Sequence, residues 1–364
     1  MIKYAVMSET NTNKTPKISI IIPVYNVEKW LQRCFDSLRE QTFVDYDVWM
    51  VDDGSKDGSG ELCDELAKKD SRFHVIHQKN GGAAAARNAA FAHAKGEYFY
   101  FMDPDDWCEP TMLDDMYRTA KKHNLELLVT GYYIDTYYEK DKYYRELRNA
   151  PNKIYKTQAD FRCDAHKLFD EQLLYTPWNK LYLRKYLINN KIQFPATFWD
   201  DLPFNLDVVR DVERVGCMDK HYYHFLRARE EAENTKYRPD MYDKREEEDA
   251  WLRQLYDYWK IQNDEVNEFL ARRYSERLIG CIENLTCKNC NLSTKEKKQK
   301  IKEMISSKHA QKAIRDTKPN SFMMKLMLFP LKHKMTGLTY TESKFISFVK
   351  QKNTKVFATL KANR

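Results

Sequence analysis

The stretch at residues 98–107, which reads Tyr-Phe-Tyr-Phe-Met-Asp-Pro-Asp-Asp-Trp, constrains the fold most strongly. Its first five residues are aromatic or apolar throughout, a pattern typical of a strand that is buried on both faces of a mostly parallel sheet. Three carboxylates follow within four positions, at Asp103, Asp105 and Asp106. Ligands of open α/β sheets bind outside the carboxyl ends of the strands, so we expect these side chains at a binding edge.

Neighbouring carboxylates repel one another unless a cation or several hydrogen-bond donors compensate their charge. Oxygen ligands on a turn suit a hard divalent ion such as Mg²⁺ or Mn²⁺, which is usually shared with substrate phosphates. A strand followed by a solvated acidic turn would have the same sequence. The choice between these two interpretations depends on the rest of the chain.

The surrounding sequence alternates between strand and helix patterns. Strand patterns lie at 17–25, 47–51, 73–77 and 97–102, and the helix patterns between them lie at 27–38, 57–66 and 83–94. This alternation is typical of a parallel α/β sheet. A helix near 111–123 and a strand near 125–133 extend the layout, and helical patterns dominate 242–309. The polar, tyrosine-rich residues 137–148 predict an excursion over the surface.

Polar residues follow each of the four predicted strands. Tyr25 ends the first strand, Asp52 follows the second, and Gly81, Gly82 and Arg87 follow the third. A sheet edge lined in this way suits a nucleotide, because it offers a carboxylate for the base or ribose, a cation for phosphate and a metal site for the diphosphate. The glycine pair lacks the G-x-G-x-x-G spacing and follows the third strand rather than the first, which excludes a dinucleotide-binding fingerprint.

Four segments, in this order, resemble the motifs of family 2 glycosyltransferases: residues 20–26, 51–55, 80–88 and 103–107. The resemblance is close over residues 17–110 and looser to about residue 230. Residues 178–182 and 200–204 also resemble family segments near the acceptor, although Asp200 stands where the family usually has Glu and Pro104 where it usually has Ser. The resemblance implies an inverting, nucleotide-sugar-dependent enzyme of the GT-A fold. That fold is a Rossmann-like α/β fold with a mixed, mostly parallel sheet flanked by helices.

The resemblance also implies roles for individual residues. Asp103 and Asp105 would form an Asp-x-Asp pair that binds Mn²⁺ or Mg²⁺, and Asp201 would be the catalytic base. The nucleotide-sugar donor would contact Pro23, Val24, Tyr25, Asp52, Arg87, Asp103 and Asp106. Plainer interpretations remain open for four residues: Pro23 and Val24 fit ordinary strand-end positions, Asp53 fits a turn, and Lys180 fits an ion pair with a neighbouring carboxylate.

The implied chemistry requires groups of this kind. A sugar hydroxyl is a weak nucleophile at neutral pH, and a carboxylate that takes its proton contributes a factor of about 10²–10⁴ to the rate. The leaving diphosphate develops negative charge, which a bound cation stabilises by several kcal/mol. Attack from the face opposite the leaving group gives inversion at the anomeric carbon.

Charge is distributed unevenly along the chain. The net charge is +7, and residues 291–364 hold 18 Lys and Arg against 4 Asp and Glu, which is +14 for this part and −7 for residues 1–290. Lysines alternate with Phe, Met and Leu in residues 319–364, a pattern that suits a helix lying on an anionic membrane surface. A domain-closing helix or a homo-oligomer contact would have the same pattern. Nothing in the chain resembles a nucleic-acid recognition module.

Several features favour a cytoplasmic protein. The chain has no apolar core near its start that would suit a signal peptide and no apolar run near the ~18 residues of a spanning helix. Its eight cysteines are scattered and suit reduced thiols. Cys287 and Cys290 form a lone CxxC pair near Cys281, without the second pair or clustered histidines of a zinc site. The basic tail favours peripheral attachment at the inner face of the membrane.

We predict four parts: a polar leader at 1–16, a GT-A catalytic domain at 17–235, a helical region at 236–318 and a basic amphipathic tail at 319–364. Within the catalytic domain, residues 17–110 would bind the nucleotide and residues 111–235 the acceptor. The predicted function is transfer of a sugar from a nucleotide-diphosphate sugar, with a UDP-sugar favoured, to a hydroxyl of a glycan or lipid-linked acceptor in cell-surface polysaccharide synthesis. One alternative is a sugar nucleotidyltransferase, which would need a Gly-rich, basic phosphate loop after the first strand. Another is an inert carbohydrate- or partner-binding subunit, which would not need the acidic residues.

Overall fold

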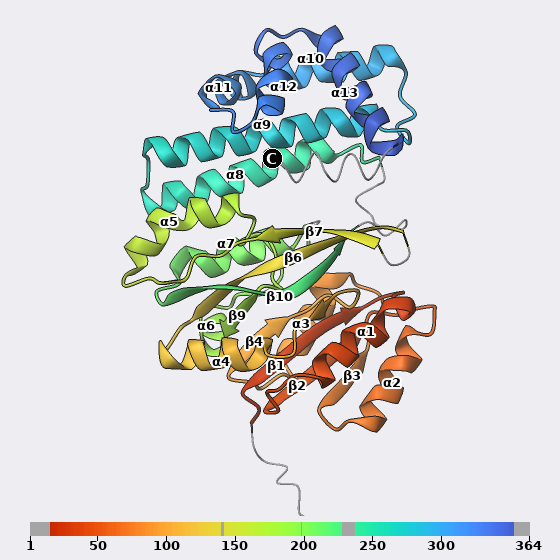
Figure 1. The fold of residues 1–364 in the computed structure, drawn as a ribbon, viewed down its shortest axis with the longest axis vertical. Helices are drawn as coiled ribbons and strands as arrows, with labels where there is room; N and C mark the ends of the chain where they lie inside the picture. Colours follow the sequence, from red (N-terminus) through yellow and green to blue (C-terminus); the bar gives the residue numbers. More distant parts are fainter. Residues whose placement is uncertain (1–14, 140–141, 198, 228–236, 353–364) are drawn as a thin grey trace, which may run out of the picture. The chain divides into compact units, whose positions relative to one another are not determined.

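The computed structural model describes residues 15–139, 142–197, 199–227 and 237–352 (Figure 1). The chain divides into two compact units. The first comprises Met1–Leu128 and Lys180–Asp200, and the second comprises Val129–Asn179 and Asp201–Arg364. Most of the predicted leader at 1–16 lies outside the described residues, as do residues 228–236 and the end of the predicted tail from residue 353 onward.

The first unit is built around a mixed, mostly parallel sheet with the strand order β3-β2-β1-β4-β9. These strands are β1 (Ile18–Val24), β2 (Tyr46–Asp52), β3 (Phe73–His77), β4 (Tyr98–Phe101) and β9 (Lys180–Leu183). The first four run parallel, whereas β9 is antiparallel to β4. Every residue of β1 and β4 is buried, which confirms the predicted α/β sheet and the buried strand before the three carboxylates.

Three helices make the crossovers between the parallel strands: α1 (Glu28–Arg39), α2 (Ser59–Lys69) and α3 (Ala83–Phe91). The first two crossovers step from β1 to β2 and from β2 to β3, and the third returns past β2 and β1 to β4. Because such connections are right-handed, α3 covers the face of the sheet opposite α1 and α2. The unit also contains β5 (Trp107–Cys108), α4 (Met112–Lys122) and α6 (Arg184–Asn189).

The second unit has its own strands. They are β6 (Leu127–Glu139), which begins at the end of the first unit, β7 (Lys142–Arg148), β8 (Lys153–Ile154) and β10 (Val215–Arg227). β7 is antiparallel to β6 and β8 is antiparallel to β10. The surface excursion expected at 137–148 is largely the β6–β7 hairpin, so the strand β7 was not predicted. β7 has a single buried residue and is rich in charged residues. Such a polar composition protects sheet edges but resembles a loop in a sequence.

Helices make up the rest of the second unit (Figure 1). They are α5 (Gln158–Asp170), α7 (Asp201–Asp211), α8 (Met241–Trp259), α9 (Asp264–Thr286), α10 (Thr294–Ser306), α11 (Lys308–Asp316), α12 (Phe322–Lys332) and α13 (Thr336–Lys352). The predicted helical stretch at 242–309 is thus observed. A buried apolar core joins α9 to the helices that follow it, and its members include Leu278 and Ile282 of α9, Ile305 of α10 and Leu328 of α12.

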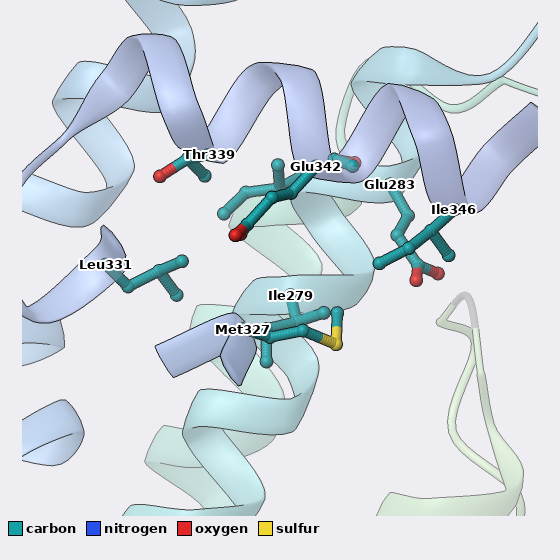
Figure 2. Close-up of a pocket in the computed structure, with 9 residues that line it drawn as sticks. Ile279, Glu283, Met327, Leu331, Thr339, Glu342 and Ile346 are labelled. Carbon is teal, nitrogen blue, oxygen red and sulfur yellow. The ribbon is translucent and has the colours of Figure 1, made fainter. Parts of the chain in front are cut away.

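Figure 2 shows a small pocket between α9, α12 and α13, which Ile279, Met327 and Leu331 help to line. Its volume of about 20 Å³ leaves room for about one water molecule. The pocket is therefore a packing feature and not a substrate site. Across the described ranges, no helix combines the length and the apolar composition that crossing a membrane requires.

Candidate active site

The strand register brings the predicted nucleotide-binding residues to one edge of the first unit's sheet. Val24, the last residue of β1, pairs with Asp52, the last residue of β2. On the other side of β1, the pairing with β4 ends at Ile21 and Phe101, and Asp103 follows two residues later. Asp52 and Asp103 therefore flank the carboxyl end of β1, as the sequence predicted for a ligand-binding edge.

Three predicted donor-binding residues, Pro23, Val24 and Tyr25, lie at the end of β1. Pro23 and Val24 are buried, and the Val24 carbonyl accepts a hydrogen bond from the backbone N–H of Asp53 at 2.8 Å. Tyr25 is exposed beyond the strand. Of the three, Tyr25 is thus the residue whose side chain is open to a ligand, whereas the other two would act through their backbone or shape.

Asp52 is buried and held in place on both of its oxygens. Its Oδ1 accepts a hydrogen bond from the backbone N–H of Ser55 at 3.0 Å, and its Oδ2 lies 2.9 Å from Nδ1 of His77. The other ring nitrogen of His77 lies 3.1 Å from Asp64. Burial alone would raise the pKa of Asp52, but the hydrogen bonds from Ser55 and His77 outweigh it and lower the pKa. Asp52 is therefore an anchored carboxylate at the end of β2.

Asp53 has a structural function that fits the turn position expected from the sequence. Its buried carboxylate accepts hydrogen bonds from Gln78 Nε2 at 2.7 Å, Gly81 N at 2.9 Å and Gly82 N at 2.8 Å. Gly82 has a φ of +88°, a backbone conformation that favours glycine. Asp53 thus fixes the turn that leads into α3 and, through that helix, the position of Arg87.

Arg87 joins two acidic residues that are distant in sequence. Its Nη2 donates to Asp103 Oδ1 at 3.0 Å, and its Nη1 donates to Asp200 Oδ2 at 3.1 Å. The guanidinium is buried and lies over the ring of Phe194, 4.9 Å from its centroid. The predicted Arg87 therefore lies beside the Asp-x-Asp motif.

Asp200 is a member of this cluster that sequence reasoning did not assign to the site. Burial raises its pKa, the positive charge of Arg87 lowers it and the Asp103 carboxylate raises it, and the net effect is an increase. Its only sequence signal was its place in the acidic pair with Asp201.

Asp201, the predicted base, is the first residue of α7 in the second unit, and its carbonyl accepts a hydrogen bond from Asn205 at 2.8 Å.

The three carboxylates after β4 differ in exposure. The Asp103 side chain keeps 25% of its surface exposed, Asp105 is buried, and Asp106 is fully buried. The turn is fixed by Arg33, which donates to the Asp105 carbonyl at 3.0 Å and lies over the ring of Trp107. Asp103 is therefore the carboxylate of the three that is most open to a ligand.

The donor groups present around Asp103 and Asp105 limit the kind of metal site that these residues can form. Within the described residues, no three His, Cys, Asp or Glu side chains are grouped so that they could hold a metal ion. Mg²⁺ and Mn²⁺ sites that act on nucleotides usually need one or two carboxylates, and water and substrate phosphates complete the coordination. The two aspartates fit a cation of this shared kind and not one enclosed by protein alone.

Comparisons with known proteins agree with this geometry. Residues 19–189 match the family model described as glycosyl transferase family 2. The chain is 28% identical to the uncharacterized glycosyltransferase EpsJ of Bacillus subtilis, over 83% of this chain and 87% of that protein. It is 35% identical to the putative glycosyltransferase EpsH of the same organism, over 50% of this chain, and spans about half the length of EpsH.

Solved structures show the same fold. The crystal structure of residues 1–349 of S. aureus TarS superimposes with a TM-score of 0.58 at 20% sequence identity, and the match covers 90% of each chain. The family match, the curated relatives and the strand order with its acidic carboxyl edge agree with one another. Residues 19–189 form a glycosyltransferase family 2 domain, and the chain is a glycosyltransferase with a GT-A fold.

Proposed function

We propose that this glycosyltransferase transfers a sugar, with inversion, from a UDP-sugar to a hydroxyl of a glycan or lipid-linked acceptor in cell-surface polysaccharide synthesis. The observation that carries the proposal is the sheet edge where Asp52 and Asp103 flank β1 and Arg87 lies against Asp103. TarS, which shares the fold, has been solved with UDP and with UDP-GlcNAc. UDP is therefore the first nucleotide to test.

The donor would lie across this edge. Its base and ribose would contact Tyr25, Asp52 and the backbone near Pro23 and Val24, and its phosphates would lie near Arg87. The full burial of Asp106 favours a role in shaping the turn over a direct contact with the ribose or sugar. The catalytic part would comprise residues 17–235, with the nucleotide bound by 17–110 and the acceptor by 111–235. Residues 236–318 and 319–364 would form the helical region and the tail.

Asp103 and Asp105 would hold Mn²⁺ or Mg²⁺ together with the donor's diphosphate. When bound, such a cation neutralises the charge that develops on the leaving diphosphate. The chain contributes its own cation, because the guanidinium of Arg87 already lies 3.0 Å from Asp103. Arg87 thus reduces the repulsion between the acidic edge and an anionic donor.

Asp201 would act as the general base. Its carboxylate would take the proton of the acceptor hydroxyl while the hydroxyl oxygen bonds to the anomeric carbon and the bond to the diphosphate breaks. Asp200, its neighbour, would act as a positioning residue, because its ion pair with Arg87 fixes the chain directly before α7. Asp201 would then accept the proton, while Asp200 would anchor the segment before α7.

We also propose that the enzyme is cytoplasmic and peripheral at the inner face of the membrane, through part of residues 319–364. This location suits a lipid-linked acceptor, because such an acceptor presents its hydroxyl close to the membrane surface.

The direct test is a panel of UDP-, GDP- and dTDP-linked sugars in which release of the free nucleotide is measured. We expect hydrolysis of a UDP-sugar, loss of activity with excess EDTA, and recovery on addition of Mn²⁺ or Mg²⁺. Asp105→Asn should abolish hydrolysis, whereas Asp36→Asn on the exposed side of α1 should have no effect. Undiminished hydrolysis in excess EDTA would contradict the metal assignment, and hydrolysis of GDP-sugars alone would contradict the UDP assignment.

A further inference from the structure

Helices α12 and α13, with the turn between them, carry most of the exposed large apolar side chains among the described residues. Fourteen large apolar side chains are exposed among the described residues, and eight of them lie between residues 322 and 348. These eight are Phe322, Met323, Leu326, Phe329, Met335, Leu338, Phe345 and Phe348. Isolated exposed apolar side chains are ordinary, but a concentration of them marks an interaction site.

Only one side of α12 packs into the apolar core of the described residues. Met324, Leu328 and Leu331 lie in the apolar core that α9, α10 and α11 share. Phe322, Leu326 and Phe329 recur at intervals of four and three residues, so they share the other side of the helix, where Phe322 is 79% exposed. One side of α12 is thus used for folding, and an equally apolar side remains in solvent.

Helix α13 is oriented against the usual rule for a surface helix. Its inward side carries hydroxyl groups: Ser343 and Ser347 are buried, and their oxygens lie 2.7 and 3.1 Å from the hydroxyl of Thr286 on α9. Its outward side carries Leu338, Phe345 and Phe348, and Phe345 is 67% exposed. Although Tyr340 and Ile346 also pack inward, the exposed phenylalanines leave a large apolar side of α13 in water, which a partner would explain.

Lysines accompany the exposed apolar side chains. Between residues 322 and 348 the chain has four lysines, Lys325, Lys332, Lys334 and Lys344, and one acidic residue, Glu342. All four lysines are exposed, whereas Glu342 lines the small pocket between α9, α12 and α13 (Figure 2). The outward faces of the two helices are therefore both apolar and cationic.

We propose that the outward faces of α12 and α13 bind an anionic lipid bilayer. The exposed Phe, Leu and Met side chains would enter the boundary between headgroups and acyl chains, and the lysines would contact the anionic headgroups. The binding would be peripheral, because the eleven residues of α12 extend over about 17 Å and a bilayer core is about 30 Å thick. The inference deepens the proposed function and rests on it for its purpose, which is to bring the active site to a lipid-linked acceptor.

Charge argues against a second copy of the chain as the occupant of these faces. A two-fold dimer uses the same patch on both subunits, so it would bring the lysines of one copy against those of the other. With Glu342 as the single acidic residue of the segment, each copy offers little to compensate them. An anionic bilayer would bury the apolar side chains and pair with the lysines at the same time.

Co-sedimentation of the full chain with phosphatidylcholine vesicles, with and without phosphatidylglycerol, tests this inference. We expect binding to vesicles that contain phosphatidylglycerol, and weaker binding at high salt because exposed charges are screened. Leu326→Glu and Phe345→Glu should each weaken binding about tenfold or more, since insertion of one such side chain contributes at least that factor. Lys332→Glu combined with Lys344→Glu should remove the preference for phosphatidylglycerol.

Val44→Glu is the matched control, because Val44 is a 74% exposed apolar residue in the first unit, and it should leave binding unchanged. A chain truncated near residue 318 would be a poor test, since it would remove Met324, Leu328 and Leu331 from the core. The inference would be overturned if Leu326→Glu and Phe345→Glu both bound the vesicles as the wild type does. It would also be overturned if the wild type did not bind phosphatidylglycerol vesicles at low salt. A wild-type dimer in light scattering that becomes monomeric in these variants would overturn it as well. UDP-sugar hydrolysis by the same variants separates this result from the proposed function.

Discussion

Arg87 of α3 donates a hydrogen bond to Asp103 across 3.0 Å and so ties the helix after β3 to the acidic loop after β4. The same guanidinium donates to Asp200 at 3.1 Å. One buried cation thus pairs with an acidic residue of the Asp-x-Asp motif and with the residue before the predicted base, and offsets part of their negative charge. The edge is held in this arrangement by the protein itself, before any donor binds.

Arg87→Met should lower the free energy of unfolding at neutral pH by up to about 3 kcal/mol, the low end of the range for a broken buried ion pair, because Asp103 stays partly exposed. The loss should be smaller in acid. Without Arg87, the already raised pKa of the Asp200 carboxyl rises further. The stability of the variant therefore falls as the pH increases from the ordinary pKa of an aspartate toward the raised pKa of Asp200. Urea unfolding at several pH values measures this. Arg87→Lys should lose less, the exposed Arg118→Met should lose nothing measurable, and an equal loss at every pH would contradict the Asp200 assignment.

His77→Asn should weaken stability in a pH-dependent way. The hydrogen bonds to Asp52 and Asp64 raise the pKa of His77, so its stabilising contribution is complete below the ordinary pKa of about 6.5 and disappears as pH rises through the raised value. The contribution should not exceed about 1 kcal/mol, because His77 is half exposed and its ion pairs are screened. The measurement is the difference in unfolding free energy between variant and wild type against pH. His123→Asn, at the exposed end of α4, is the control, and a difference that persists at alkaline pH would refute the prediction.

Asp201→Asn should separate catalysis from donor binding. If Asp201 is the base, kcat falls by about 10²–10⁴, and the Kd for UDP stays within a few-fold of the wild-type value. Asp207→Asn, on the same helix, is the matched control and should leave kcat unchanged. Wild-type kcat for Asp201→Asn would move the role to Asp200, whose carboxylate is adjacent in sequence. Steady-state transfer kinetics and UDP titration supply the two readings.

Glu248→Gln should destabilise the helical part of the second unit. Burial would raise the pKa of Glu248, but Arg277, Arg245 and Arg273 outweigh it and lower the pKa to about 2. The carboxylate therefore contributes about 3 kcal/mol above its ordinary pKa, and this contribution is lost as pH falls from about 4.5 to 2. Unfolding free energies should differ by that amount at pH 7 and converge in acid. Glu247→Gln, at the exposed neighbouring position, should have little effect, and a similar loss in both variants would contradict the assignment.

Much of the first unit could be predicted from sequence because its signals are local. The alternation of strands and helices depends on periodicity within ten or twelve residues, and the four motifs lie where parallel strands end. β4 followed by Asp103 and Asp105 is found where it was expected. β7 was missed because an exposed edge strand lacks the alternation of apolar and polar residues that identifies a half-buried one.

The sequence by itself determined the family, the α/β sheet and the identity of the acidic and basic residues at its edge. The tertiary structure alone decided which of them meet: Arg87 with Asp200, 113 positions away, Asp52 with His77, and Asp53 with the turn before α3. It also decided that α13 buries its serines and exposes its phenylalanines. The reason is physical. Periodicity shows that a helix has an apolar side, but only packing against the rest of the chain selects the side that faces inward.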